Sequence, residues 1–127
     1  MRYLLDTHTV IWYLEASSRL PPGTKKFIDN NEGHLSLCSV SLWETAIKVN
    51  LGKLKLHSTF DEFLDKVRNS DIELLQIEDK HLKSLSVLPS LHKDPFDRLL
   101  ISTALVENLT IITADDNVRK YDVPWIW

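Results

Sequence analysis

The stretch HKDPFDRLLISTALVENLTIITADD, residues 92–116, contains a helix and a strand in succession, and it ends in two acids. Asp94 is a favourable N-cap residue, and Pro95 suits the first position of a helix, so we expect a helix over residues 95–108. The continuous apolar run at residues 109–113 is typical of a strand buried on both faces of a parallel sheet. The stretch therefore predicts an α/β fold whose functional groups follow the strand ends.

The rest of the chain alternates in the same way. Apolar runs predict further strands at residues 2–5, 35–39, 72–77 and 123–127. Amphipathic or capped segments predict helices at residues 9–15, 24–31, 40–49, 60–69 and 79–87. Strands that alternate with helices indicate a parallel sheet covered by helices on both faces. No repeat or linker interrupts the sequence, so we expect a single domain over residues 1–127.

Composition excludes several classes of protein. Apolar residues make up 43% of the 127 residues and charged residues 26%, as in soluble globular proteins. The formal net charge of −3 gives no overall attraction for nucleic acid. Any binding of RNA or DNA must therefore be local, mediated by a metal, or built at the cleft of a dimer.

The sequence also bears on the compartment. Cys38 is the single cysteine, so no internal disulfide can form, which fits a reducing environment. The first 15 residues contain acids and a histidine too early for a signal peptide, and no apolar run is long enough for a membrane span. We expect a cytoplasmic protein with no membrane association.

Acidic residues follow the predicted strands. Asp6 comes directly after the strand at residues 2–5, and Asp115 and Asp116 follow the strand at residues 109–113. Glu44 lies early in the helix after the strand at residues 35–39. In parallel sheets, functional groups gather beyond the carboxyl ends of the strands, so these acids are candidates for one site.

Asp97 stands out, because it shares a helical stripe with Ile101, Ala104 and Leu105 that should face the core. Burying an unpaired carboxylate costs several kcal/mol, and no lysine or arginine lies on this stripe. A divalent cation shared by Asp6, Asp97 and Asp115 would neutralise the charge. Oxygen ligands favour Mg²⁺ or Mn²⁺.

Each acid also has a purely structural explanation. Asp6 could cap the next helix, and Asp97 could complement its helix dipole, a contribution of ~0.3–1 kcal/mol. Glu44 and Lys48 are spaced for an i,i+4 ion pair, and Asp115 or Asp116 could cap the turn that follows.

Four motifs carry a family resemblance. They are LLDTHTVIW with Asp6, SVSLWETAIK with Glu44, HKDPFDRLLISTAL with Asp97, and LTIITADD with Asp115. In this order and with these neighbours, the sequence resembles the PIN domain over nearly its whole length, and more narrowly the VapC-type ribonuclease toxins of prokaryotic toxin–antitoxin pairs. The resemblance implies a three-layer α/β/α domain with a central parallel sheet, a Mg²⁺ or Mn²⁺ site, RNA cleavage, a homodimer and a cognate antitoxin partner.

The resemblance gives the acids catalytic roles. Asp6 and Asp97 would ligate the metal, and Asp115 would do so directly or through water. Glu44 would orient the attacking water or a second ion, so one and two ions both remain open. Lys48 and Arg98 are candidates for phosphate contacts, although an ordinary surface ion pair is the simpler explanation for each. Asp115 is favoured over Asp116 because it lies nearer the strand end.

Two other functions compete with a nuclease. A phosphoacceptor receiver-type signalling module is also an acid-rich α/β domain of about this length, but it requires an acid pair after its first strand and an aspartate after its third. Here the paired acids come late in the chain. A catalytically silent PIN-like domain used only for binding would not need the full set of acids.

Overall fold

The computed structural model describes residues 2–127. Its strands are β1 (Tyr3–Leu5), β2 (Leu35–Cys38), β3 (Glu73–Leu75), β4 (Thr110–Ile112) and β5 (Trp125–Ile126). Its helices are α1 (Thr7–Leu14), α2 (Pro22–Asp29), α3 (Ser39–Asn50), α4 (Phe60–Asn69), α5 (Asp79–Ser86), α6 (Pro95–Glu107) and α7 (Asp116–Arg119). The predicted alternation of strands and helices is confirmed.

The five strands form one sheet in the order β3-β2-β1-β4-β5, and all neighbouring pairs are parallel. The chain builds outward from β1 to β3, then crosses back and continues with β4 on the other side of β1. The order of the strands therefore reverses between β1 and β4, where Leu5 pairs with Ile112. Ligands of open α/β sheets bind outside the carboxyl ends of the strands at such a reversal.

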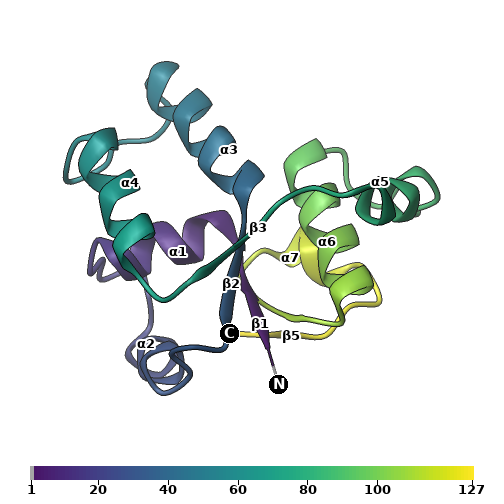
Figure 1. Ribbon diagram of the computed structural model, residues 1–127, viewed down its shortest axis with the longest axis horizontal. Coiled ribbons are helices and arrows are strands. Elements are labelled where there is room, and N and C mark those ends of the chain that lie inside the picture. The colour runs from purple at the N-terminus through teal and green to yellow at the C-terminus, as the bar shows by residue number, and fades with distance from the viewer. Residues whose placement is uncertain (1) are drawn as a thin grey trace.

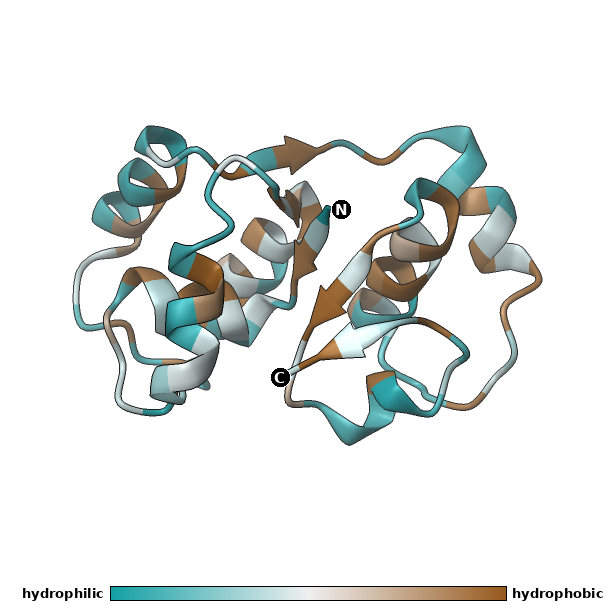
Figure 2. Ribbon diagram, turned by 90° about the horizontal axis from the view of Figure 1, so that it is seen from below, coloured by the Kyte–Doolittle hydropathy of each residue, from teal (hydrophilic) through white to brown (hydrophobic). Residues whose placement is uncertain are grey.

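Helices cover both faces of the sheet, as Figure 1 shows with α1, α2 and α4 on one side and α5, α6 and α7 on the other. Side chains alternate across the strands, so Leu4 and Ile111 pack in a core beneath α6, whereas Leu5 and Ile112 pack beneath α1 and α4. The hydropathy colouring in Figure 2 shows apolar strands between the two groups of helices. The predicted three-layer α/β/α fold is confirmed.

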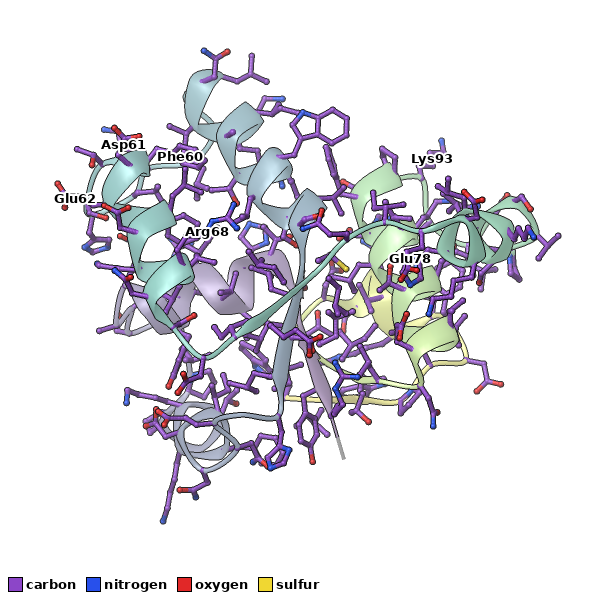
Figure 3. All side chains as sticks on the ribbon, viewed as in Figure 1. Phe60, Asp61, Glu62, Arg68, Glu78 and Lys93 are labelled. Carbon is purple, nitrogen blue, oxygen red and sulfur yellow. The ribbon has the colours of Figure 1, made fainter. Side chains whose placement is uncertain are left out.

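Two of the helices that begin at the carboxyl edge of the sheet, α3 and α6, carry predicted acids. In α3, Ser39 follows directly on the last residue of β2. Because β4 runs parallel to β1, the connection that enters β4 through α6 must start at this same edge. Lys93, labelled in Figure 3, marks the segment that leads into α6. The acidic first turn of α6 is therefore brought to the strand ends, although no strand enters this helix directly.

The structure differs from the sequence-based expectation in two details. The short helix α7 was expected only as a turn. Leu105 was expected on the buried stripe of α6, yet it is 42% exposed, whereas Ile101 and Ala104 are buried. Leu105 lies about 80° around the helix from Asp97, at the margin of the stripe that meets the sheet. Among the described residues, no helix is long and apolar enough to cross a membrane.

Candidate active site

Asp6 is held at the end of β1 by a residue of the neighbouring strand segment. Its backbone occupies the N-cap position of α1, but its side chain makes no capping hydrogen bond. Instead, the Thr113 hydroxyl donates to Asp6 Oδ2 over 2.6 Å, and the side chain is buried. Burial raises the pKa of Asp6, against the opposing effects of the Thr113 hydrogen bond and of His8. The structural explanation of Asp6 as a simple helix cap is therefore wrong.

Asp115 is joined to the same hydrogen-bond chain. Its backbone N–H donates to Thr113 Oγ1 over 3.0 Å, and its Oδ1 accepts the Asn117 N–H over 2.8 Å, which caps α7. Asp116, by contrast, has a side chain that is 92% exposed and lies 3.5 Å from Arg119. Of the two neighbouring acids, the structure brings Asp115 to Asp6 and leaves Asp116 on the surface.

Asp97 enters the site from the first turn of α6. Asp94 caps this helix, because its Oδ1 accepts the N–H groups of Phe96 and Asp97 at 2.9 and 3.0 Å. Asp97 Oδ2 lies 2.8 Å from His92 Nε2, in the loop before the helix. His92 thus supplies a hydrogen bond to Asp97 that sequence reasoning did not assign.

The electrostatic environment of Asp97 is unfavourable to a charge. Burial and repulsion by Asp6, Asp94 and Asp115 raise the pKa of Asp97 to about 7, although the hydrogen bond with His92 opposes the shift. The pKa of Asp6 is raised in the same sense, with Asp115 adding to the effect of burial. These carboxyl groups therefore lie close enough to penalise one another's ionisation.

Glu44 is buried on α3, but its carboxylate is well compensated. Lys48 Nζ donates to Oε2 over 2.6 Å, so the predicted i,i+4 ion pair is confirmed. The Thr7 hydroxyl lies 2.8 Å from Glu44 Oε1 and 2.9 Å from Ser41 Oγ. Because a carboxylate only accepts, Thr7 donates to Glu44 and Ser41 donates to Thr7. Glu44 is thus fixed in one orientation.

Lys48 interacts electrostatically with Asp94 and Asp97 as well as with Glu44. Burial lowers the pKa of Lys48. The hydrogen bond to Glu44 and the charges of Asp94 and Asp97 raise this pKa by a larger amount, so the net shift is upward. The ammonium group therefore stays charged beside the site.

The acids converge at the reversal of strand order. Ligand atoms of His92, Asp97 and Asp115 all lie within 4.8 Å of one another. Asp6 interacts electrostatically with Asp97 and Asp115, and together with Asp115 it lines a cavity of about 280 Å³. Three segments distant in sequence thus meet at one edge of the sheet, which is the arrangement expected of a metal site formed by carboxylates.

Arg98 does not join this group. Its guanidinium donates to the carbonyl oxygens of Leu88, Pro89 and His92 and to the Tyr121 hydroxyl, at 2.9–3.3 Å. These bonds tie the loop at residues 88–92 to α6. The structure therefore gives Arg98 a role in holding His92, and it does not support the predicted contact with phosphate.

Sequence reasoning missed the contacts of Thr113 and His92. Thr113 is a polar residue at the end of an apolar strand, two positions before Asp115, and that placement is the signal that could have found it. His92 precedes Asp97 by five residues across a helix start, a spacing that has no regular contact in a helix or a strand.

Comparison with known proteins supports this assignment of fold. The PIN domain family model matches residues 3–124. No curated protein matches the chain. Similar solved structures are VapBC2 from Rickettsia felis bound to a DNA fragment from their promoter (18% identity, TM-score 0.75, 99% of this chain and 98% of that chain), DNA-bound VapBC from Salmonella typhimurium (15%, 0.72, 99% and 97%) and FitAcB from Neisseria gonorrhoeae (16%, 0.73, 98% and 96%).

At these identities the solved structures show a shared fold. The sheet order also excludes the receiver-type alternative, since flavodoxin-like domains of that class have the order 2-1-3-4-5. The family model spans nearly the whole chain and includes Asp6, Glu44, Asp97 and Asp115. The chain therefore belongs to the PIN-domain family.

Proposed function

We propose that the protein is a Mg²⁺- or Mn²⁺-dependent endoribonuclease and the toxin of a toxin–antitoxin pair. The observation that carries the proposal is the convergence of Asp6, Asp97 and Asp115 beside the ordered carboxylate of Glu44. PIN domains are generally nucleases, which supports the reaction class.

The residues present fit a divalent cation. Asp6 and Asp97 are carboxyl groups whose pKa is raised by burial and by neighbouring acids, so a cation among them would remove an electrostatic penalty. Carboxylate oxygens are the ligands that Mg²⁺ and Mn²⁺ prefer. Asp6, Asp97 and Asp115 would hold the ion, and its bound form supplies Lewis acidity and a lowered pKa for water.

The other residues have separate tasks in this proposal. Glu44, fixed by Thr7 and Lys48, orients the attacking water and accepts its proton. Lys48 uses one of its three N–H donors on Glu44, so the remaining donors are free to contact a phosphate oxygen. His92 holds Asp97 in place from the adjoining loop.

The partner proposal rests on the similar structures. VapBC2, VapBC and FitAcB are each described as complexes, and two of them are bound to DNA. By likeness to them, we infer that a small antitoxin binds this protein and that the toxin forms a homodimer. The formal net charge of −3 suits an association with a partner that carries basic side chains.

The test is RNA cleavage by the purified chain. Protein free of any partner should cut single-stranded RNA with Mg²⁺ or Mn²⁺ and stop on addition of EDTA. Asp6→Asn and Asp97→Asn should each lower the rate at least a hundredfold, whereas Asp65→Asn, an exposed acid on α4, should match the wild type. Cleavage that persists in EDTA and in both site variants would refute the proposal.

A further inference from the structure

Two adjoining cavities extend from the acids along the surface of α1. The cavity of about 280 Å³ that contains Asp6 and Asp115 is also lined by His8, Trp12 and Arg19. Trp12 and Arg19 also line a neighbouring cavity of about 300 Å³. The two cavities therefore adjoin at these two residues and form one hollow that leads away from the acids.

The far end of this hollow is cationic. Lys53, Lys55 and His57 line it together with Arg19, and all four side chains are exposed. Within residues 2–127, the structure records no salt bridge or side-chain hydrogen bond for Arg19, Lys53 or Lys55. Asp6 and Asp115 lie at the opposite end, so positive charge is concentrated at the far end of the hollow.

One acid, Glu15, lines the far end of the hollow, but it is already engaged. Glu15 follows α1 directly, and its carboxylate accepts the His57 N–H at 2.9 and 3.2 Å and the Ser58 hydroxyl at 3.5 Å. These bonds attach the segment after α3 to the end of α1. The cationic wall is therefore fixed in place relative to Trp12.

The sequence explains why the lysines point outward. After α3 ends, residues 53–57 read KLKLH, an alternation of polar and apolar residues. Leu54 and Leu56 pack against the core beneath α1 and α4. Lys53 and Lys55 stay exposed, and both line the hollow together with Leu54.

Aromatic rings lie between the cations and the acids. His8 and Trp12 are one helical turn apart on α1, with ring centroids 5.8 Å apart. Trp127 supports Trp12 from behind, at 6.0 Å in an edge-on arrangement. Trp12 is only partly buried, so one side of the indole remains open to the hollow.

We propose that this hollow is a track for single-stranded RNA that delivers the chain to the acids. Arg19, Lys53 and Lys55 contact backbone phosphates, and Trp12 with His8 stacks an unpaired base next to the scissile bond. Positive grooves combined with aromatic rings are the general means by which proteins bind single strands. The inference rests on the proposed ribonuclease function and adds to it the path of the strand and the residues that hold it.

Binding is measured on the full chain in EDTA, where the proposed nuclease is inactive. The probe is a fluorescein-labelled single-stranded RNA of about 12 nucleotides, followed by fluorescence anisotropy. The triple variant Arg19→Gln, Lys53→Gln, Lys55→Gln should bind at least tenfold more weakly. Each phosphate contact on a single strand contributes about 0.7 to the slope of log affinity against log salt, so the slope should fall by about 2.

A matched control separates the track from general charge. Lys26, Lys66 and Lys83 are exposed lysines on α2, α4 and α5 that line neither cavity. Changing all three to Gln removes the same number of charges, yet it should leave both the affinity and the salt slope close to wild type.

The stacking role has its own test. Trp12→Leu should weaken RNA binding about tenfold, in the range of one stacked base. It should not affect an abasic ribose-phosphate strand of the same length, whereas general damage to the fold would weaken both probes. His8→Ala, which changes an exposed side chain, should act in the same direction with a smaller effect.

The outcomes distinguish this inference from the proposed function. If the protein binds RNA through these residues but never cleaves it, the RNA track is supported and the ribonuclease proposal is refuted. If the protein cleaves RNA and the triple variant has the same salt slope and KM as the lysine control, only the RNA track is refuted. If the triple variant binds RNA normally but no longer retains a co-expressed partner protein, the hollow is a protein interface, and the RNA track is refuted.

Discussion

The surroundings of the Asp97 carboxyl group in the folded protein favour its neutral form. Burial has the largest effect, and three other aspartates add to it. Glu44 is buried more deeply than Asp97, yet Lys48 and Thr7 compensate its charge. The contrast between these two acids on the same edge of the sheet indicates that Asp97 is kept for a charged ligand and contributes nothing to stability as a free carboxylate.

Asp97→Asn should therefore raise the melting temperature of the metal-free protein while abolishing activity, because the amide removes a penalised charge and keeps the shape. Each kcal/mol gained corresponds to roughly 2–8 °C. Mn²⁺ should reverse the order, since a ligand at a hundredfold excess over its Kd stabilises the native state by about 2.7 kcal/mol. Thermal melts of the wild type and of Asp97→Asn, in EDTA and in Mn²⁺, measure these changes in melting temperature.

If Asp97 were only a helix-dipole residue, Asn would cost a few tenths of a kcal/mol and Mn²⁺ would shift both proteins equally. Asp65→Asn, on the exposed surface of α4, serves as the control for removing a negative charge.

The raised pKa of Asp97 also predicts an unusual pH dependence. The ordinary value of 3.8 applies to the unfolded chain and about 7 to the folded one, so between these values the folded state binds a proton that the unfolded state releases. Metal-free wild type should accordingly lose stability as the pH rises from 5 to 8. Asp97→Asn should show a flatter profile, and parallel profiles in melts across this range would contradict the assignment.

At the scale of elements, the loop between α5 and α6 is held by one tyrosine. The Tyr121 hydroxyl accepts the N–H groups of Leu91 and His92, each at 3.1 Å, and donates to Pro89 O over 2.7 Å. Arg98 binds the same loop from α6. Because His92 contacts Asp97, the loop fixes a residue of the site from outside it.

Tyr121→Phe should consequently destabilise the protein by about 1–3 kcal/mol, the cost of leaving buried polar groups unpaired. It should also lower cleavage activity, because His92 loses its support. Urea unfolding and RNA cleavage measure the two effects. Tyr3→Phe is the control, since the structure records no hydrogen bond for the Tyr3 hydroxyl within the described residues, and it should change neither quantity appreciably.

For the whole molecule, the order β3-β2-β1-β4-β5 places β1 and β4 side by side. Asp6 and Thr113 are 107 positions apart in the chain, yet they share a hydrogen bond of 2.6 Å. The site is assembled only in the folded domain, and its activity should therefore depend on the intact domain.

Expression of the chain alone should arrest growth of a bacterial host, because cleavage of cellular RNA stops protein synthesis. Co-expression with the small protein encoded beside it should restore growth and give a complex that elutes as one peak in gel filtration. Asp6→Asn, with its charge removed, should be harmless by itself and should still bind that partner. Normal growth with wild type, without a partner, would refute the toxin role.

Much of this protein could be predicted because its signals are local in the chain. Apolar runs separated by capped helices give the parallel α/β class, and the acid after each strand gives Asp6 and Asp115 as candidates. The helical pattern of residues 95–108 likewise identifies Asp97 as a charged residue on an apolar face. Neighbouring residues determine each of these features, so the sequence by itself determined the fold class and the residue types at the site.

Tertiary structure decided which segments meet. The reversal between β1 and β4, the contact of His92 with Asp97 and the hydrogen bond from Thr113 to Asp6 join residues without a regular spacing. The cationic wall of residues 53–57 is likewise joined to the end of α1 by the hydrogen bonds of Glu15 with the His57 backbone. Such contacts arise from packing across the sheet and between loops, where partners are selected by position in space, and no local pattern in the chain specifies them.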